Sequence, residues 1–346
     1  MTAATALARL IEMHTYQRPA GSCHERKFIN RYIRQCGATS DAFGNWSVVI
    51  GDNPRHVWSS HTDTVHTRTG KQRVFVDDNG ILSSSSGECL GADDTVGAWL
   101  MTELIRRGVS GRYVFHYGEE HGCIGSRNLV RSDPAWIHAT DIVIALDRMH
   151  TTEVITHQCG ARTASDEFAE GLADQLNADD SLHYAPSSRG MYTDSESYAA
   201  DVPECTNLAV GYAGQHGRNE TLDTRHALAL LDRLTVLDVS RLPITRKAGE
   251  DDEYDYPRLD THDETFWNRY GVPAYRETVG RVLTDECPDC GEWCADDDDR
   301  CLYCGRAIPP IQEAGTSTYL DRIYGDVQRA LRAEWNEIER LKRKDR

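Results

Sequence analysis

Five short stretches of the sequence carry histidine or carboxylate side chains that can bind metal ions. They are HVWSSHTDTVH (56–66), LGADDTVG (90–97), HYGEEHGCIGS (116–126), ALDRMH (145–150) and NLAVGYAGQHGRNE (207–220). Each stands beside a strand-like or helix-like segment, and an α/β sheet usually builds its site at the carboxyl ends of its strands. Any one stretch alone has a simpler explanation, such as a helix cap, a solvated acidic pair or a structural histidine. The ordered set of five is hard to obtain by chance.

The chemistry of these stretches suits a metal-dependent hydrolase. In His-x-Asp, the carboxylate of Asp63 can fix the tautomer of His61 so that one ring nitrogen is left to bind metal. One carboxylate of the pair Asp93 and Asp94 can bridge two cations. In the pair at 119–120, one carboxylate can bind metal while the other transfers protons.

These motifs, in this order, resemble the co-catalytic zinc exopeptidase superfamily. That superfamily includes the bacterial leucyl aminopeptidases, peptidase T and the acetylornithine deacetylase group. The resemblance covers roughly residues 1–240 and rests on "SSHTDTVH", "GADDTVG", "GEEHGCIGS", "ALDR" and "GYAGQHGRNE". It implies two catalytic zinc ions, for which manganese or cobalt could substitute.

The resemblance also implies a role for each matching residue. The implied metal ligands are His61 and Asp147 for one ion, His216 and Glu120 for the other, and Asp93 as the bridge between them. Glu119 is implied as the general base, and Asp63 as the residue that orients His61. A cis peptide bond is expected between Asp93 and Asp94, as is frequent in the family.

The span between Asp147 and His216 favours the compact aminopeptidase branch of the superfamily. It is too short for the lid or dimerisation domain that the deacetylase branch inserts there, so an oxyanion donor from a lid is not expected. GMYTDSESY (190–198) loosely resembles the segment that supplies a tyrosine donor in compact members. Tyr192 is therefore the candidate catalytic donor, with a packing role as the alternative.

Strand-like and helix-like segments alternate up to about residue 245, which predicts an α/β fold. We expect a three-layer sandwich with a mixed, largely parallel central sheet, followed by a small zinc ribbon and a terminal helix. The expected strands are 47–51, 56–61, 112–118, 141–147 and 206–212; the expected helices include 1–17, 95–105 and 225–242.

Composition excludes several classes of function. The 55 acidic residues exceed the 38 basic ones, and a net charge of −17 disfavours binding to nucleic acid. No apolar run approaches the length of a membrane helix, and the start of the sequence lacks the pattern of a signal peptide. With 11 cysteines, five of them clustered at metal-ligand spacing, a cytoplasmic protein is expected rather than a disulfide-bonded one.

The cysteine cluster predicts a structural zinc site. Two Cys-x-x-Cys pairs, Cys287 with Cys290 and Cys301 with Cys304, could close a tetrahedral shell with no open position. Disulfides and an iron–sulfur centre are the alternatives, and Cys294 is not expected to bind. The four acidic residues at 296–299 argue against a ribbon that binds nucleic acid. A ribbon that stabilises the fold, or one that binds a partner or controls substrate access, is favoured.

The predicted organisation has four parts: a catalytic domain (1–245), an acidic linker (246–279), the ribbon (280–308) and a C-terminal helix (309–346) whose apolar face could dock on a second subunit. The predicted function is hydrolysis of peptide or small amide substrates by an exopeptidase, most simply an aminopeptidase. An N-acyl amino acid deacylase is one alternative. Another alternative is a non-catalytic binding or assembly protein, in which the ribbon and the helix would bind the partner.

Overall fold

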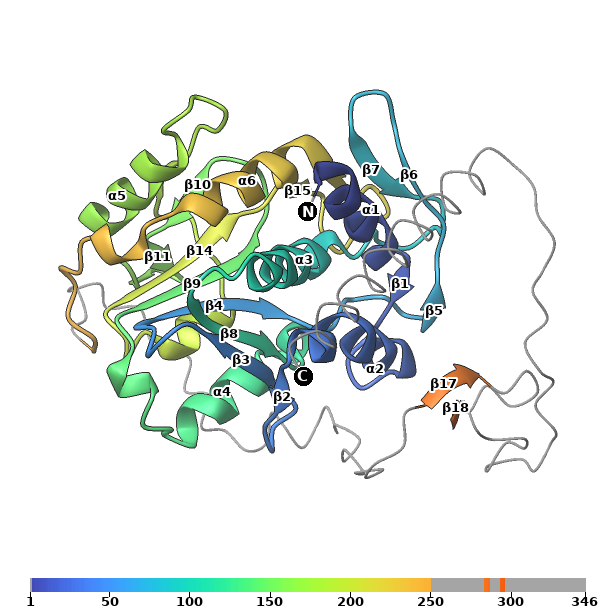
Figure 1. Ribbon diagram of the computed structural model, residues 1–346, viewed down its shortest axis with the longest axis horizontal. Coiled ribbons are helices and arrows are strands. Elements are labelled where there is room, and N and C mark those ends of the chain that lie inside the picture. Colours follow the sequence, from blue (N-terminus) through green and yellow to red (C-terminus); the bar gives the residue numbers. More distant parts are fainter. Residues whose placement is uncertain (1, 250–282, 287–292, 296–346) are drawn as a thin grey trace, which may run out of the picture. The chain divides into compact units, whose positions relative to one another are not determined.

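The computed structural model describes residues 2–249, 283–286 and 293–295 (Figure 1). The chain divides into two compact units. One is Leu10–Tyr275, and the other combines residues 1–9 with 276–346. In the second unit, the strands β17 (Leu283–Glu286) and β18 (Trp293–Ala295) form an antiparallel pair.

An eight-stranded mixed sheet forms the centre of the unit Leu10–Tyr275 (Figure 1). Its order is β13 (Ala185–Ser187), β10 (Glu153–Ile155), β14 (Glu204–Ala209), β9 (Ile142–Arg148), β4 (His56–His61), β8 (Gly111–His116), β3 (Trp46–Ile50) and β2 (Thr39–Ser40). The four strands from β14 to β8 are parallel to one another, whereas β10 and β3 run antiparallel to their inner neighbours. The predicted mixed, largely parallel sheet is thus confirmed.

Helices cover both faces of this sheet, which explains why its central strands β4, β8, β9 and β14 are buried along most of their length. On one side, α3 (Ala92–Arg106) contacts β4 and β9, and α6 (Thr224–Val236) packs on α3 and on α5 (Asp166–Leu176) (Figure 1). The other side carries α4 (Ile124–Arg131) and the 3-10 turn η5 (Asp194–Tyr198). Leu129 of α4 and Tyr198 of η5 share a core with three valines of the sheet, Val57, Val114 and Val143. The expected three-layer sandwich is confirmed.

A second, four-stranded antiparallel sheet was not expected from the sequence. Its order is β15 (Tyr212–Ala213), β16 (Thr221–Asp223), β7 (Ile81–Ser84) and β6 (Val74–Val76). The loop between β15 and β16 contains His216, so this sheet positions one predicted metal ligand. Its strands have only two to four residues each, too few for the period-two pattern on which a strand prediction relies.

The remaining elements are short. They are α1 (Ala3–Met13), β1 (Tyr16–Gln17), α2 (Cys23–Phe28), η1 (Ile29–Ile33), η2 (Arg34–Cys36), β5 (Gly70–Lys71), η3 (Glu119–His121), η4 (Ile137–Ala139), β11 (His157–Gln158), β12 (Ala161–Arg162) and η6 (Val239–Arg241). Strand β1 pairs with β5 in antiparallel orientation.

Two predicted helices are shorter than expected. The sequence predicted a helix over 1–17, but α1 ends at Met13, and Tyr16–Gln17 pair with β5 as strand β1. The sequence predicted a continuous helix over 225–242, but α6 ends at Val236 and Leu237 is extended. The side chain of Asp238 accepts a hydrogen bond from the backbone of Ser240 and begins the separate turn η6. Aspartate competes with the helix for backbone donors in this way.

Residues 2–249 contain six cysteines, and all six are free thiols. No helix among these residues is long and apolar enough to cross a membrane. The four predicted ribbon ligands, Cys287, Cys290, Cys301 and Cys304, and the predicted terminal helix lie outside the described residues. The ribbon, its zinc ion and the four-part domain division therefore stay predictions.

Candidate metal centre

His61 ends strand β4 and is fully buried. Its Nδ1 lies 3.1 Å from the carbonyl oxygen of Asp63 and 3.4 Å from Oδ1 of the same residue. Because both atoms are acceptors, Nδ1 carries the proton and Nε2 is left to bind. That Nε2 lies 3.1 Å from Oδ1 of Asp93 and 3.7 Å from Oδ1 of Asp147.

Asp93 lies between two imidazoles. It stands in the first turn of α3, where its backbone is non-helical and the expected cis peptide bond joins it to Asp94. While Oδ1 faces His61, Oδ2 lies 3.1 Å from Nε2 of His216. The same nitrogen of His216 lies 3.1 Å from Oε2 of Glu120. One carboxylate thus presents one oxygen to each histidine, the arrangement needed to bridge two cations.

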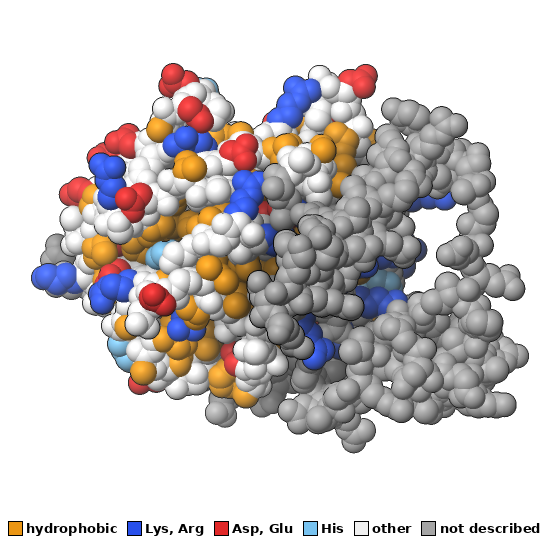
Figure 2. Space-filling view, viewed as in Figure 1, with side chains coloured by type: hydrophobic (Ala, Val, Ile, Leu, Met, Phe, Trp, Pro, Cys, Tyr) orange, Lys and Arg blue, Asp and Glu red, His pale blue; other side chains and the backbone are white. Residues whose placement is uncertain are grey.

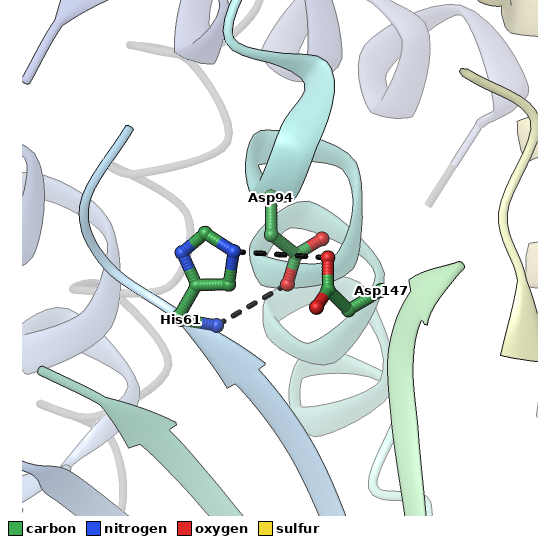
Figure 3. Close-up of side chains that lie close together, drawn as sticks. All are labelled: His61, Asp94 and Asp147. Atoms are coloured by element: carbon green, nitrogen blue, oxygen red, sulfur yellow. Dashed lines mark hydrogen bonds and ion pairs between the residues drawn. The ribbon is translucent and has the colours of Figure 1, made fainter. Parts of the chain in front are cut away.

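Asp94 also lies beside His61 and Asp147, and the three residues offer ligand atoms within 4.8 Å of one another (Figure 3). However, its two oxygens are engaged by backbone donors. Oδ2 accepts from the amide of His61 at 3.2 Å, and Oδ1 accepts from the amide of Gly97 at 2.8 Å. A Cβ at position 97 would collide with this carboxylate and with the carbonyl oxygen of Leu146. Asp94 therefore ties α3 to the end of β4, and Asp93 is the better bridging candidate.

Asp147 lies near the end of β9, where it points toward His61 (Figure 3). Its Oδ2 accepts a hydrogen bond of 2.7 Å from the hydroxyl of Thr193, and its carbonyl oxygen accepts one of 3.1 Å from Tyr212. Burial, together with the negative charge of Asp93, raises the pKa of Asp147 to about 6. Neither hydroxyl partner was predicted from the sequence, because both lie more than 40 positions from Asp147 and no local pattern links them to it.

Glu119, the predicted general base, lies in the turn η3. Burial raises the pKa of Glu119 well above its usual range, and repulsion from Asp147 adds to this effect. The Glu119 amide donates to Oδ1 of Asp63 at 3.2 Å, and the Cys123 thiol donates to its Oε1 at 3.5 Å. Its Oε2 lies 4.0 Å from Nε2 of His61. Glu119 is therefore beside the ligand cluster, able to hold a proton there.

The cluster fits divalent cations. Burial raises the pKa of Glu120 to about 7, and its Oε1 is buried with no hydrogen-bond partner among the described residues. Burial also raises the pKa of Asp194 to about 7, and the negative charge of Asp147 adds to this effect. Carboxylates outnumber the two imidazoles, and a buried surplus of negative charge is costly unless cations compensate it. Imidazole nitrogens and carboxylate oxygens are ligands that suit zinc.

Glu220 is a site residue whose role sequence analysis missed. Its buried carboxylate accepts hydrogen bonds from the amides of Gly91, at 2.7 Å, and of Asp93, at 3.0 Å. Since it stands in the same loop as His216, it joins the segments that carry two predicted ligands. The signal was present in the His-x-x-x-Glu spacing, but its partners are far away in sequence.

Tyr192, the predicted oxyanion donor, lies close to the cluster without contacting its predicted ligands through any hydrogen bond between described residues. Its phenol oxygen accepts a hydrogen bond of 2.5 Å from Nε of Arg127 and lies 3.3 Å from Oγ of Ser197. The next residue, Thr193, donates to Asp147. The donor role of Tyr192 stays a prediction.

The matches to known proteins agree with this geometry. Residues 48–201 match the model of peptidase family M28, a segment that contains every predicted ligand except His216 and the cysteines. This segment is thus similar to peptidase family M28, which agrees with the resemblance of the sequence motifs to the co-catalytic zinc exopeptidase superfamily. The chain is a metallopeptidase of the exopeptidase class, as the sequence predicted. No curated protein matches it significantly.

Solved structures of two aminopeptidases and a tripeptidase share the fold of this chain. The aminopeptidase PepT from Bacillus cereus is 14% identical, with a TM-score of 0.57, and the match covers 68% of this chain and 98% of PepT. A tripeptidase from Staphylococcus aureus is 14% identical, with a TM-score of 0.54 and the same two coverages. An aminopeptidase from the archaeon Desulfurococcus kamchatkensis is 12% identical, with a TM-score of 0.51 over 68% of this chain and 95% of its own.

Proposed function

We propose that the chain is an aminopeptidase that uses two zinc ions. His61 and Asp147 would hold one ion, His216 and Glu120 the other, and Asp93 would bridge them. When bound, the ions would polarise the scissile carbonyl and make water a stronger nucleophile. Zinc follows from the nitrogen and oxygen donors, although manganese and cobalt suit the same donors.

The observation that carries this proposal is the placement of Asp93 between two imidazoles. Its oxygens lie 3.1 Å from Nε2 of His61 and 3.1 Å from Nε2 of His216. In a single-ion site both imidazoles would bind the same cation, whereas here a carboxylate lies between them with one oxygen toward each. The buried Oε1 of Glu120 has no hydrogen-bond partner among the described residues, which supports a cation on the His216 side as well.

Glu119 is proposed as the general base. Its raised pKa, caused first by burial, suits a group that takes a proton from the attacking water and later delivers it to the leaving nitrogen. The water oxygen bonds to the carbonyl carbon, the carbon–nitrogen bond breaks, and Glu119 ends the cycle ionised. Asp63 is proposed to hold His61 in the tautomer that leaves Nε2 free.

The test is the variant Glu119→Gln, with bound metal and turnover measured together. We expect turnover to fall by about 10²- to 10⁴-fold while metal content stays unchanged, because the amide cannot accept a proton. Glu170→Gln, on the exposed side of α5, is a matched control that should keep full activity. Full activity in Glu119→Gln would contradict the proposed base.

Substrate class is tested by comparing amino-acid amides, dipeptides and N-acetyl amino acids. The proposal expects hydrolysis of substrates with a free amine, which the surplus of carboxylates in the site favours. Faster cleavage of N-acetyl amino acids would instead support the deacylase alternative. If the predicted ribbon also binds zinc, the full chain should hold about three zinc ions. A cytoplasmic location stays a prediction.

A further inference from the structure

The second sheet has an outer edge that is unusual for its exposed apolar side chains. Strand β6 is the outermost strand of this sheet among the described residues. On it, Phe75 is 49% exposed and Val76 is 37% exposed, whereas most large apolar side chains of the described chain are buried. In Figure 2, hydrophobic side chains lie beside charged ones at the end of the hairpin formed by β6 and β7. An edge strand of this kind can pair with another strand.

The hydrogen-bond alternation shows which backbone groups face outward. The amide of Asp77 donates to the carbonyl of Ile81, and the amide of Ser85 donates to the carbonyl of Arg73. Because antiparallel strands alternate strictly, residues 73, 75 and 77 direct their backbone groups toward β7. The N–H and C=O groups of Val74 and Val76 therefore point away from the sheet.

The free edge has a defined length. On one side, the amide of Gln72 donates to the carbonyl of Thr15 at 2.7 Å, so the edge is covered up to residue 72. On the other side, the chain turns back between Asp77 and Gly80, whose amide donates to the carbonyl of Asp77. The window that a further strand can occupy is thus 73–77, the sequence Arg-Val-Phe-Val-Asp.

This window is complementary to itself. When two copies run antiparallel about Phe75, Val74 of one copy faces Val76 of the other, and the outward backbone groups of both meet as hydrogen-bonded pairs. The two Phe75 rings become neighbours across the strands. Arg73 of one copy lies opposite Asp77 of the other, which gives two pairs of opposite charge. Neither side chain has an ion-pair partner among the residues that the structure describes.

We propose that the chain forms a homodimer by antiparallel pairing of β6 with β6 of a second copy, in the register centred on Phe75. The proposal does not depend on the catalytic assignment. Nor does it use the C-terminal helix, for which oligomerisation was predicted from the sequence. Because the window is short, the dimer should be weak and concentration-dependent.

The test is sedimentation velocity of the full chain over a wide range of concentrations. We expect a monomer–dimer equilibrium. Arg73→Asp and Asp77→Arg each replace two attractions with two repulsions, and each should raise the dissociation constant about tenfold or more. The double variant Arg73→Asp/Asp77→Arg restores opposite charges and should recover the dimer. Phe75→Lys should abolish it.

Mixing the two charge-reversed variants gives the most specific test of the proposed charge pairs. An equimolar mixture of the Arg73→Asp and Asp77→Arg proteins should form a heterodimer, since every cross-strand charge pair is then of opposite sign. Val236→Lys, which changes an exposed apolar residue on α6, is the control and should leave the dimer unchanged. Peptidase activity of each variant verifies folding. A monomer at all concentrations, or a dimer that is indifferent to the charge changes, would overturn the proposal.

Discussion

The two halves of the candidate metal centre are built in different ways. His61 ends a central strand of the parallel sheet, has no exposed surface, and has its ring held by Asp63. His216 lies in a loop of the small second sheet, with a backbone φ of 64° and a side chain that is 50% exposed. The first half is therefore part of the core, whereas the second depends on a few hydrogen bonds that hold its loop in place.

Glu220 is what connects the exposed half to the buried one. Its carboxylate binds the amides of Gly91 and Asp93, so the His216 loop cannot shift without breaking two buried hydrogen bonds. A loop ligand can be as well placed as a core ligand when such a contact fixes it. The comparison predicts that the two halves respond differently to substitution.

The largest expected difference is between His61→Ala and His216→Ala. Both should abolish activity, because each removes a proposed ligand. Only His61→Ala should also destabilise the metal-free chain, by about 3 kcal/mol, since it leaves buried carboxylates without their imidazole. His216→Ala should cost less than about 1 kcal/mol, because its side chain is half exposed.

Urea unfolding after treatment with a chelator measures this contrast. Equal destabilisation by the two variants would show that the distinction between a core half and a loop half is wrong. Gln215→Ala, beside His216 in the same loop, is the matched control and should retain both activity and stability.

A smaller effect is expected from Glu220→Gln and Glu220→Ala. Loss of the contact to Gly91 and Asp93 should weaken metal binding in the His216 half by about 10- to 100-fold. Glu220→Gln keeps one acceptor and should recover part of the loss. Cobalt titration followed by its visible absorption measures the two halves separately; equal weakening of both would contradict a role specific to the loop.

The last prediction concerns the acid stability of the buried half. His116 lies beside His61 in the sheet register, and burial, together with the positive charge of His61, lowers its pKa to about 3. The unfolded state recovers a pKa of about 6.5, so it binds a proton that the folded state does not. Stability should therefore fall as pH drops from about 6.5 towards 3, by about 1.4 kcal/mol per pH unit for this residue.

Urea midpoints of the chelated chain as a function of pH provide the measurement. His116→Gln should flatten the slope in this range. The exposed His138→Gln should leave the slope as it is. An unchanged slope in His116→Gln would mean that other groups account for the acid sensitivity.

Much of the fold could be predicted because the hydrophobic pattern within each strand or helix indicates its type and burial. The strand 141–147 is apolar along its length, as a strand covered on both faces must be, and it appears as β9. The strand 56–61 was predicted to the residue. The second sheet was missed because its strands are too short to show a period, and α6 was overextended because Asp238 starts a new turn.

The sequence by itself determined which side chains could bind metal and that they follow strands, because spacing and residue type are local properties. The resemblance implied Asp93 as the bridge, but only the tertiary structure showed why Asp94 does not take this place, since its oxygens accept from the backbone amides of His61 and Gly97. It alone showed that Glu220 holds the His216 loop to the start of α3. Such contacts join residues more than a hundred positions apart, and no local pattern encodes which distant amide a carboxylate will meet.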